Sequence, residues 1–183
     1  MQFIEESGLR LGFPADSFRF QELLAYRALS GRSLKEMDFA WHHNSKLHLL
    51  EIRDYRRLES TLKLDDLVPA SKESLPRRFS QLIDKLTDSL LLMLSVWAGT
   101  QRGNLIASEL PVGAQSLTSV RLVIALGLPA HLSIHMGILR EAINARLRGR
   151  VALADISRVT VLDYKRLCAN AASLGLQCQL LPF

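Results

Sequence analysis

The sequence has no apolar run long enough to cross a membrane and no long apolar stretch near its start. Its best apolar run begins at Leu90 and extends loosely to Trp97, whereas a bilayer-spanning helix needs ~20 apolar residues. The first residues, Met1 to Arg10, include two glutamates, so we expect no secretory signal. These absences predict a cytoplasmic protein that does not span a membrane.

The sequence also has few cysteines and no nucleotide-binding loop motif. The two cysteines, Cys168 and Cys178, form no C-x-x-C pair and have no His pair nearby. We therefore expect two reduced, mostly buried thiols rather than a disulfide or a zinc site. The chain contains neither a Walker A loop nor a G-x-G-x-x-G motif, so nothing supports a P-loop or dinucleotide-binding protein.

The composition is that of an average globular protein, with 48% hydrophobic and 22% charged residues. A length of 183 residues suits one domain, so we expect residues 1–183 to fold as a single unit. The 23 Lys and Arg exceed the 18 Asp and Glu, which gives a net charge of +5. This excess is compatible with a nucleic-acid partner but does not establish one, and it leaves a homo-oligomer open.

Hydrophobic periodicity predicts strands that alternate with helices. Apolar residues repeat at three- and four-residue steps over Arg77 to Trp97, which predicts a long amphipathic helix. The nearly continuous apolar run Val120 to Leu126 predicts a buried central strand. The other expected elements are helices over Phe18–Leu29, Ile134–Leu147 and Asp163–Ser173, strands over Arg158–Leu162 and Leu176–Leu181, and irregular connections over Glu59–Pro76 and Gly99–Thr118. We expect an α/β fold: a mixed β-sheet flanked by helices on both faces.

A β-hairpin is expected early in the chain. Residues 37–42 alternate in polarity, residues 47–53 are rich in Leu and Ile, and the polar stretch 43–46 lies between them. If Asn44 and Ser45 form the turn, the numbers of paired residues sum to 89. Asp38 then lies opposite Glu51.

This register brings charged side chains together. Asp38, Glu51 and Arg53 project from the same face of the hairpin, and the Cβ atoms of directly opposed residues lie ~5 Å apart. Two opposed carboxylates repel and need a cation between them. Arg53 is one candidate, and a divalent ion is the other, because hard cations prefer carboxylate oxygens.

Asp38 followed by Glu51-Ile52-Arg53 resembles the signature of the PD-(D/E)XK nuclease superfamily, which implies a restriction-endonuclease-like core. The resemblance implies that Asp38, Glu51 and the backbone carbonyl of Ile52 bind Mg²⁺ or Mn²⁺. In that superfamily a lysine positions or activates water and stabilises the phosphorane. Some members add an acidic residue from the first helix, and Glu22 is the matching candidate.

The sequence departs from the signature at two positions. Arg53 stands where the superfamily has lysine, and Met37 stands where it has proline. Arginine cannot act as a base, although its charge can stabilise a pentavalent phosphate. Lys85 on the long helix is a candidate replacement for the lysine. Its three-residue spacing from Asp88 favours instead a surface ion pair between the two.

Three interpretations of the hairpin follow. The first is a metal-dependent phosphodiesterase that acts on nucleic acid, with Asp38, Glu51, Arg53, Glu22 and Lys85 as candidate catalytic residues. The alternative is a catalytically inactive nuclease-like module that binds nucleic acid or a protein partner. The third is an ordinary hairpin in which an arginine neutralises a glutamate.

Overall fold

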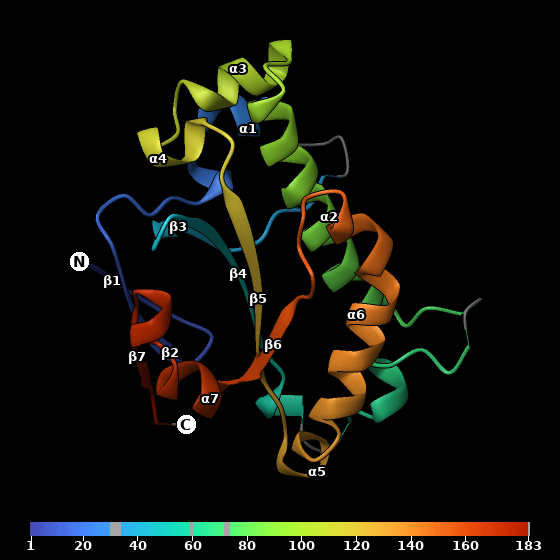
Figure 1. Cartoon of the computed structure of the whole chain (residues 1–183). Coiled ribbons are helices and arrows are strands. Elements are labelled where there is room, and N and C mark those ends of the chain that lie inside the picture. The colour runs from blue at the N-terminus through green and yellow to red at the C-terminus, as the bar shows by residue number, and fades with distance from the viewer. Residues whose placement is uncertain (30–33, 59–60, 72–73, 183) are drawn as a thin grey trace.

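The computed structural model describes residues 1–29, 34–58, 61–71 and 74–182, which form two β-sheets and surrounding helices (Figure 1). In chain order the elements are β1 (Gln2–Glu6), β2 (Leu9–Phe13), η1 (Phe20–Glu22), α1 (Leu24–Arg27), β3 (Phe39–His43), β4 (Lys46–Asp54), η2 (Arg56–Leu58), η3 (Leu64–Asp66), α2 (Arg77–Trp97), α3 (Gln101–Ala107), α4 (Val112–Gln115), β5 (Ser119–Gly127), α5 (Ala130–Ser133), α6 (Met136–Ala152), β6 (Thr160–Asp163), α7 (Tyr164–Ala169), η4 (Ala172–Leu174) and β7 (Gln177–Leu180).

The larger sheet has the strand order β3-β4-β5-β6 and confirms the predicted mixed α/β class. Strands β3 and β4 are antiparallel, whereas β4–β5 and β5–β6 are parallel. The connection from β4 to β5 contains α2, and the connection from β5 to β6 contains α6. The central strand β5 is apolar along most of its length because both faces of the sheet are covered there.

The two faces of this sheet belong to different hydrophobic clusters. Leu47 and Leu49 point from β4 toward the cluster that contains the apolar residues of α2 and α6. Leu50 and Ile52 alternate with them and join the cluster that contains α7 and β2. The β3–β4 register pairs Phe39 with Leu50, which confirms the predicted sum of 89.

The smaller sheet, in the order β1-β2-β7, was not predicted. Ser7 and Gly8 form the turn between β1 and β2, with φ of 53° and 73°. A short Ser-Gly turn between two segments that contain apolar residues is a hairpin signal that the periodicity analysis missed. The last strand was predicted near its observed position, but β7 pairs with β2 and not with the larger sheet.

The helix expected over residues 18–29 is wrong. Phe18 forms an isolated β-bridge with Ala40, so the chain is still extended there. Only the short η1 and α1 follow, and Leu23 between them caps α1 with no side-chain hydrogen bond.

The connection expected over residues 99–118 contains α3 and α4 instead. Helix α3 begins after Thr100, whose side chain accepts a hydrogen bond from the backbone N–H of Gly103. In the connection expected over residues 59–76, the structure shows η3, while residues 59–60 and 72–73 lie outside the described residues.

The expectation of two reduced thiols is also wrong. Cys168 in α7 and Cys178 in β7 form a disulfide, and their Cα atoms are 4.7 Å apart. Helix α7 packs beside β7, and this contact brings the two residues together. Their spacing in the sequence could not show that they would lie on facing elements.

In the described part of the chain, every helix is too short or too polar to cross a membrane.

The contact between α2 and α3 yields a stability prediction. A Cβ atom added at Gly103 would lie 2.0 Å from the backbone carbonyl oxygen of Ser95, whereas one added at Gly149 in α6 would meet nothing within 4 Å. Gly103→Ala should therefore lower the free energy of unfolding by about 1–3 kcal/mol. Gly149→Ala, the matched control, should raise it by about 0.5–1 kcal/mol. Urea denaturation measures both, and equal effects would contradict the close helix packing.

Candidate active site

Three charged side chains meet where α2 crosses the end of the β3–β4 hairpin. The Nζ atom of Lys85, in α2, lies 3.0 Å from Oδ1 of Asp38 and 3.0 Å from Oε2 of Glu51. A fourth charge comes from Arg53, whose Nη2 lies 2.7 Å from Oε1 of Glu51. The carboxylates therefore share one face of the sheet, as the hairpin register predicts, and cations lie against them.

The end of the β3–β4 ladder fixes Asp38. The ladder stops at the pair formed by Phe39 and Leu50, and Asp38 precedes β3. Its Oδ2 accepts a hydrogen bond of 2.8 Å from the backbone N–H of Ile52, so its side chain takes the place of the next strand residue. The guanidinium of Arg19 donates to its backbone carbonyl at 3.2 Å. Both the side chain and the backbone of Asp38 are held.

The same hydrogen bond orients the carbonyl group of Ile52. The N–H and C=O groups of one strand residue project to the same side of the strand. Because the N–H of Ile52 points at Asp38, its carbonyl oxygen faces the same sheet edge. The backbone oxygen that the resemblance implies as a ligand is therefore on the side of the two carboxylates.

Glu51 is a carboxylate in the protein core, with 0% of its side chain exposed. Burial, together with repulsion from Asp38, raises its pKa to about 8 against the opposing effects of Lys85 and Arg53. Its neighbours are less enclosed: the side chains of Asp38, Lys85 and Arg53 are 13%, 16% and 36% exposed. The network can be reached from solvent through Arg53.

The surface ion pair expected between Lys85 and Asp88 is wrong. Asp88 accepts a hydrogen bond from the backbone N–H of Lys35 at 2.9 Å, while Lys85 faces the sheet. Lys85 lies one turn before Ser89, which is buried and accepts a hydrogen bond from the backbone N–H of Met37 at 2.8 Å. These polar residues, four apart beside the apolar stripe of α2, are the sequence signal for this contact.

Glu22 is not part of the network. It lies at the end of η1 and is exposed, because the helix expected there does not form. Within the described ranges, the polar contacts of Asp38, Glu51 and Lys85 do not include it. The candidate role of Glu22 has no geometric support.

A cavity of about 640 Å³ opens beside the N-terminal part of α2, and its lining includes Arg77, Arg78 and Gln81. Gln81 precedes Lys85 by one helical turn. The guanidinium of Arg78 lies 5.5 Å from the ring centroid of Tyr55, which follows β4. The cavity is lined by these basic residues as well as by Asp65 and Asp66.

The donor atoms suit a hard divalent cation. Two carboxylates and one backbone carbonyl are oxygen ligands, and Mg²⁺ is commonly held by one or two carboxylates with several waters retained. Glu51 Oε1 has no hydrogen bond in the structure despite its ion contact with Arg53. No cluster of three or more His, Cys, Asp or Glu occurs among the described residues, so an ion held here would keep several of its waters.

Comparison with known proteins adds no assignment: no family model, curated protein or solved structure matches the chain.

The raised pKa of Glu51 yields a pH prediction. Between its usual value of 4.5 and the folded value of about 8, the native protein holds a proton that the unfolded chain has released. The free energy of unfolding should therefore fall as pH rises through this window, by at most ~1.4 kcal/mol per pH unit from this group. Glu51→Gln removes this dependence.

Thermal denaturation from pH 5 to pH 9 measures the effect. The melting temperature of Glu51→Gln should rise relative to the wild type up to about pH 8 and then stay constant. Glu141→Gln, at an exposed position of α6, controls for the amide substitution. A difference between Glu51→Gln and wild type that is the same at every pH would contradict the raised pKa.

Proposed function

We propose that the protein is a metal-dependent phosphodiesterase that acts on nucleic acid. The observation that carries this proposal is the convergence of Lys85 on Asp38 and Glu51 at the end of the β-hairpin. The resemblance requires a lysine beside two carboxylates, and α2 supplies it although Arg53 occupies the position in the motif. A surface salt bridge would not need a fully buried glutamate, whereas a cation site needs inward-facing oxygens.

Each residue has a defined role in this proposal. Asp38, Glu51 and the carbonyl of Ile52 would hold Mg²⁺ or Mn²⁺. When bound, the ion supplies positive charge that stabilises the negative charge developing on the scissile phosphate. The planar guanidinium of Arg53, which is partly exposed, donates to phosphate oxygens. With the carboxylates on the ion, the ammonium group of Lys85 would be left to donate to the attacking water or to the phosphate.

The topology supports a restriction-endonuclease-like core. The motif residues lie at the end of an antiparallel hairpin, and α2 then crosses to the parallel strand β5. The single domain over residues 1–183, the cytoplasmic location and a homo-oligomer stay predictions.

One observation favours the alternative of a catalytically inactive binding module. The ammonium group of Lys85 already bridges the two carboxylates, so the network is neutralised without a metal ion. In an inactive module this ion pair is the final state. In the enzyme it is the state that a divalent cation displaces.

Metal titration and cleavage assays separate the two functions. Mg²⁺ and Mn²⁺ binding is measured by calorimetry at pH 8.5, where Glu51 is ionised, and nicking is measured on plasmid DNA and labelled single strands of DNA and RNA. Glu51→Gln should abolish both binding and cleavage. Lys85→Gln should keep metal binding, because it removes the competing cation, but should lose roughly 10²–10³ in rate as one preorganised donor is removed.

Lys165→Gln, at an exposed position of α7, is the matched control and should leave both quantities unchanged. Cleavage that persists in Glu51→Gln would assign the activity to a contaminant and overturn the proposal. A wild-type protein that binds neither ion would leave the inactive module as the function.

A further inference from the structure

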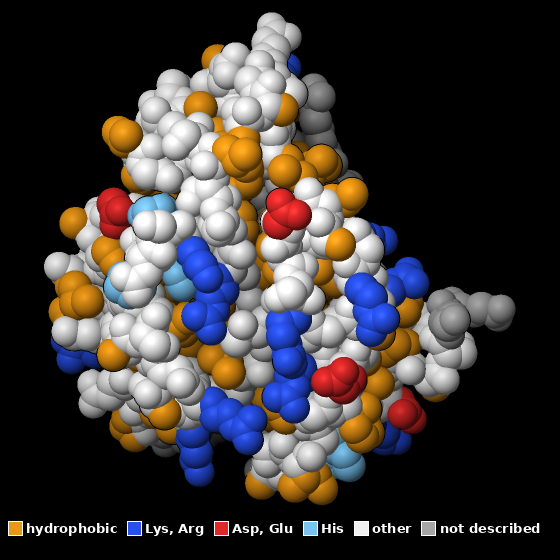
Figure 2. All heavy atoms as spheres, viewed as in Figure 1, with side chains coloured by type: hydrophobic (Ala, Val, Ile, Leu, Met, Phe, Trp, Pro, Cys, Tyr) orange, Lys and Arg blue, Asp and Glu red, His pale blue; other side chains and the backbone are white. Residues whose placement is uncertain are grey.

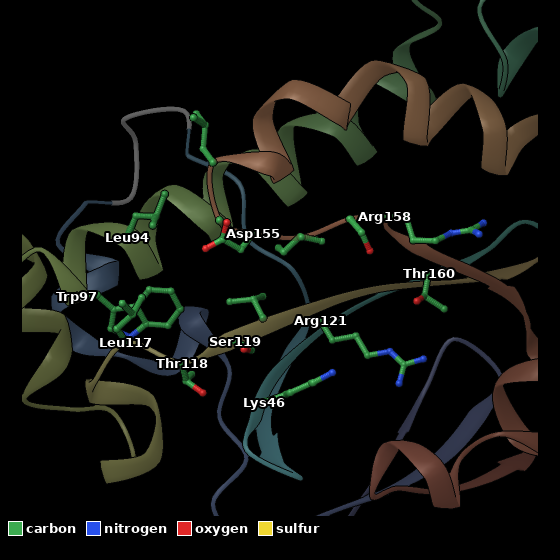
Figure 3. Close-up of a pocket in the computed structure, with 15 residues that line it drawn as sticks. Lys46, Leu94, Trp97, Leu117, Thr118, Ser119, Arg121, Asp155, Arg158 and Thr160 are labelled. Atoms are coloured by element: carbon green, nitrogen blue, oxygen red, sulfur yellow. The ribbon is translucent and has the colours of Figure 1, made fainter.

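A second cavity, of about 790 Å³, lies beside the N-terminal half of β5 (Figure 3). The β5–β6 ladder begins at the pair formed by Val123 and Thr160, so residues 119–122 have no β6 residue opposite them. The segment that joins α6 to β6 forms the other wall. We call this cavity the β5 groove.

Three cations line the β5 groove: Lys46 at the start of β4, Arg121 in β5 and Arg158 just before β6. Figure 3 shows their side chains extending in the same direction, away from Trp97 and Leu117. In Figure 2, Lys and Arg side chains gather over the middle of the face where Figure 1 places β5 and β6.

These cations have no counter-ion within the described part of the chain. None of the ion pairs found among the described residues includes Lys46, Arg121 or Arg158. In Figure 3 the one acidic residue in the lining, Asp155, lies across β5 from Lys46 and Arg121 and on the same side as Arg158. Like charges on the neighbouring strands β4 and β5 repel each other.

A buried histidine, His48, lies close enough to Arg121 and Lys46 for their charges to affect its pKa. His48 lies opposite Arg121 in the β4–β5 register. Its burial, with added repulsion from Arg121 and Lys46, lowers its pKa to about 4. His48 is therefore neutral near pH 7 and adds no charge to the row.

The other end of the groove is apolar. Trp97 is half-buried, and its indole N–H donates to the carbonyl of Ala114 at 3.0 Å, which fixes the ring. Leu117 beside it is 77% exposed. A fixed aromatic ring next to cations is the combination with which proteins bind single-stranded nucleic acid, because every base offers a flat face for stacking.

We propose that the β5 groove binds a single-stranded nucleic-acid segment, with its phosphates on Lys46, Arg121 and Arg158 and a base against Trp97 and Leu117. Neighbouring strands are ~4.8 Å apart, so Lys46 on β4 and Arg121 on β5 can face neighbouring phosphates of one strand, with Arg158 on the opposite wall of the groove. A duplex keeps its bases stacked inside and cannot use the apolar end.

This site is distinct from the candidate active site. Lys46 and Glu51 are about 16 Å apart along β4 by strand rise, and their odd spacing places them on opposite faces. The inference therefore goes beyond the proposed cleavage and does not depend on it.

The test measures binding of a fluorescein-labelled 20-nucleotide single strand by anisotropy in EDTA, where a metal-dependent nuclease cannot cut. The double variant Arg121→Gln/Arg158→Gln should weaken binding at least about fivefold. The slope of log K against log salt should decrease by about 1.4, or ~0.7 for each lost phosphate contact. Arg121→Lys/Arg158→Lys keeps the charges and should restore the slope.

The matched control is Arg102→Gln/Arg146→Gln, which removes the same charge from exposed positions of α3 and α6. Equal losses in the two Gln double variants would show general electrostatic attraction and overturn the proposal, as would no loss in either.

Competitors identify the ligand chemistry, and Trp97→Leu tests the apolar end. An unlabelled single strand should displace the probe, whereas a duplex, a mononucleotide and poly-glutamate at equal charge should not. Displacement by poly-glutamate would show a general anion site and overturn the proposal. Displacement by the mononucleotide would show that the ligand is a free nucleotide and not a strand, which would also overturn it. Trp97→Leu should weaken binding without changing the salt slope. Because all assays are in EDTA, their failure leaves the cleavage proposal standing.

Discussion

The position of α2 and of the chain before β3 depends on the buried carboxylate of Glu51. A charge that has left water needs compensation, and here the compensation comes from Lys85 and Arg53. To deliver Lys85, α2 must lie against the sheet at one fixed position along its length. To bring Asp38 within reach of the same ammonium group, the chain before β3 must be held in place. The backbone N–H of Ile52 donates to the side chain of Asp38, and the Ser89 hydroxyl accepts from the backbone N–H of Met37.

Such a network contributes little to stability overall. Replacing a buried ion pair with apolar side chains of similar volume is often neutral or stabilising, whereas removing one partner costs about 3–5 kcal/mol. A pKa of about 8 means that Glu51 is mostly protonated near neutral pH, which shows that its charge is poorly compensated. Because the charge of Glu51 contributes little to the stability of the fold, a functional role for that charge explains its presence better.

Local patterns predicted the parts of the fold that local physics decides. The boundaries of α2, the hairpin register and the buried strand β5 all follow from periodicity, and each is confirmed. Asp38, Glu51 and Arg53 could be placed on one face because strand alternation is strict. The pairing of β2 with β7 depends on a contact between the two ends of the chain, which no local window contains. The disulfide between Cys168 and Cys178 depends on the packing of α7 beside β7, which the spacing of the two residues does not show. The predicted ion pair between Lys85 and Asp88 was wrong for a related reason. Spacing along a helix shows which residues are neighbours but not which side of the helix contacts the sheet.

The length of α2 has a mechanical consequence. Lys85 and Trp97 belong to one uninterrupted helix, roughly 18 Å apart along its axis at 1.5 Å per residue. The first residue contacts the carboxylates and the second lines the β5 groove. A helix of this kind moves as a stiff rod, so a sliding or tilting of α2 that separates Lys85 from Glu51 also displaces the indole at its far end. Helix α2 therefore couples the two sites mechanically, because a movement of α2 that changes one of them also changes the other.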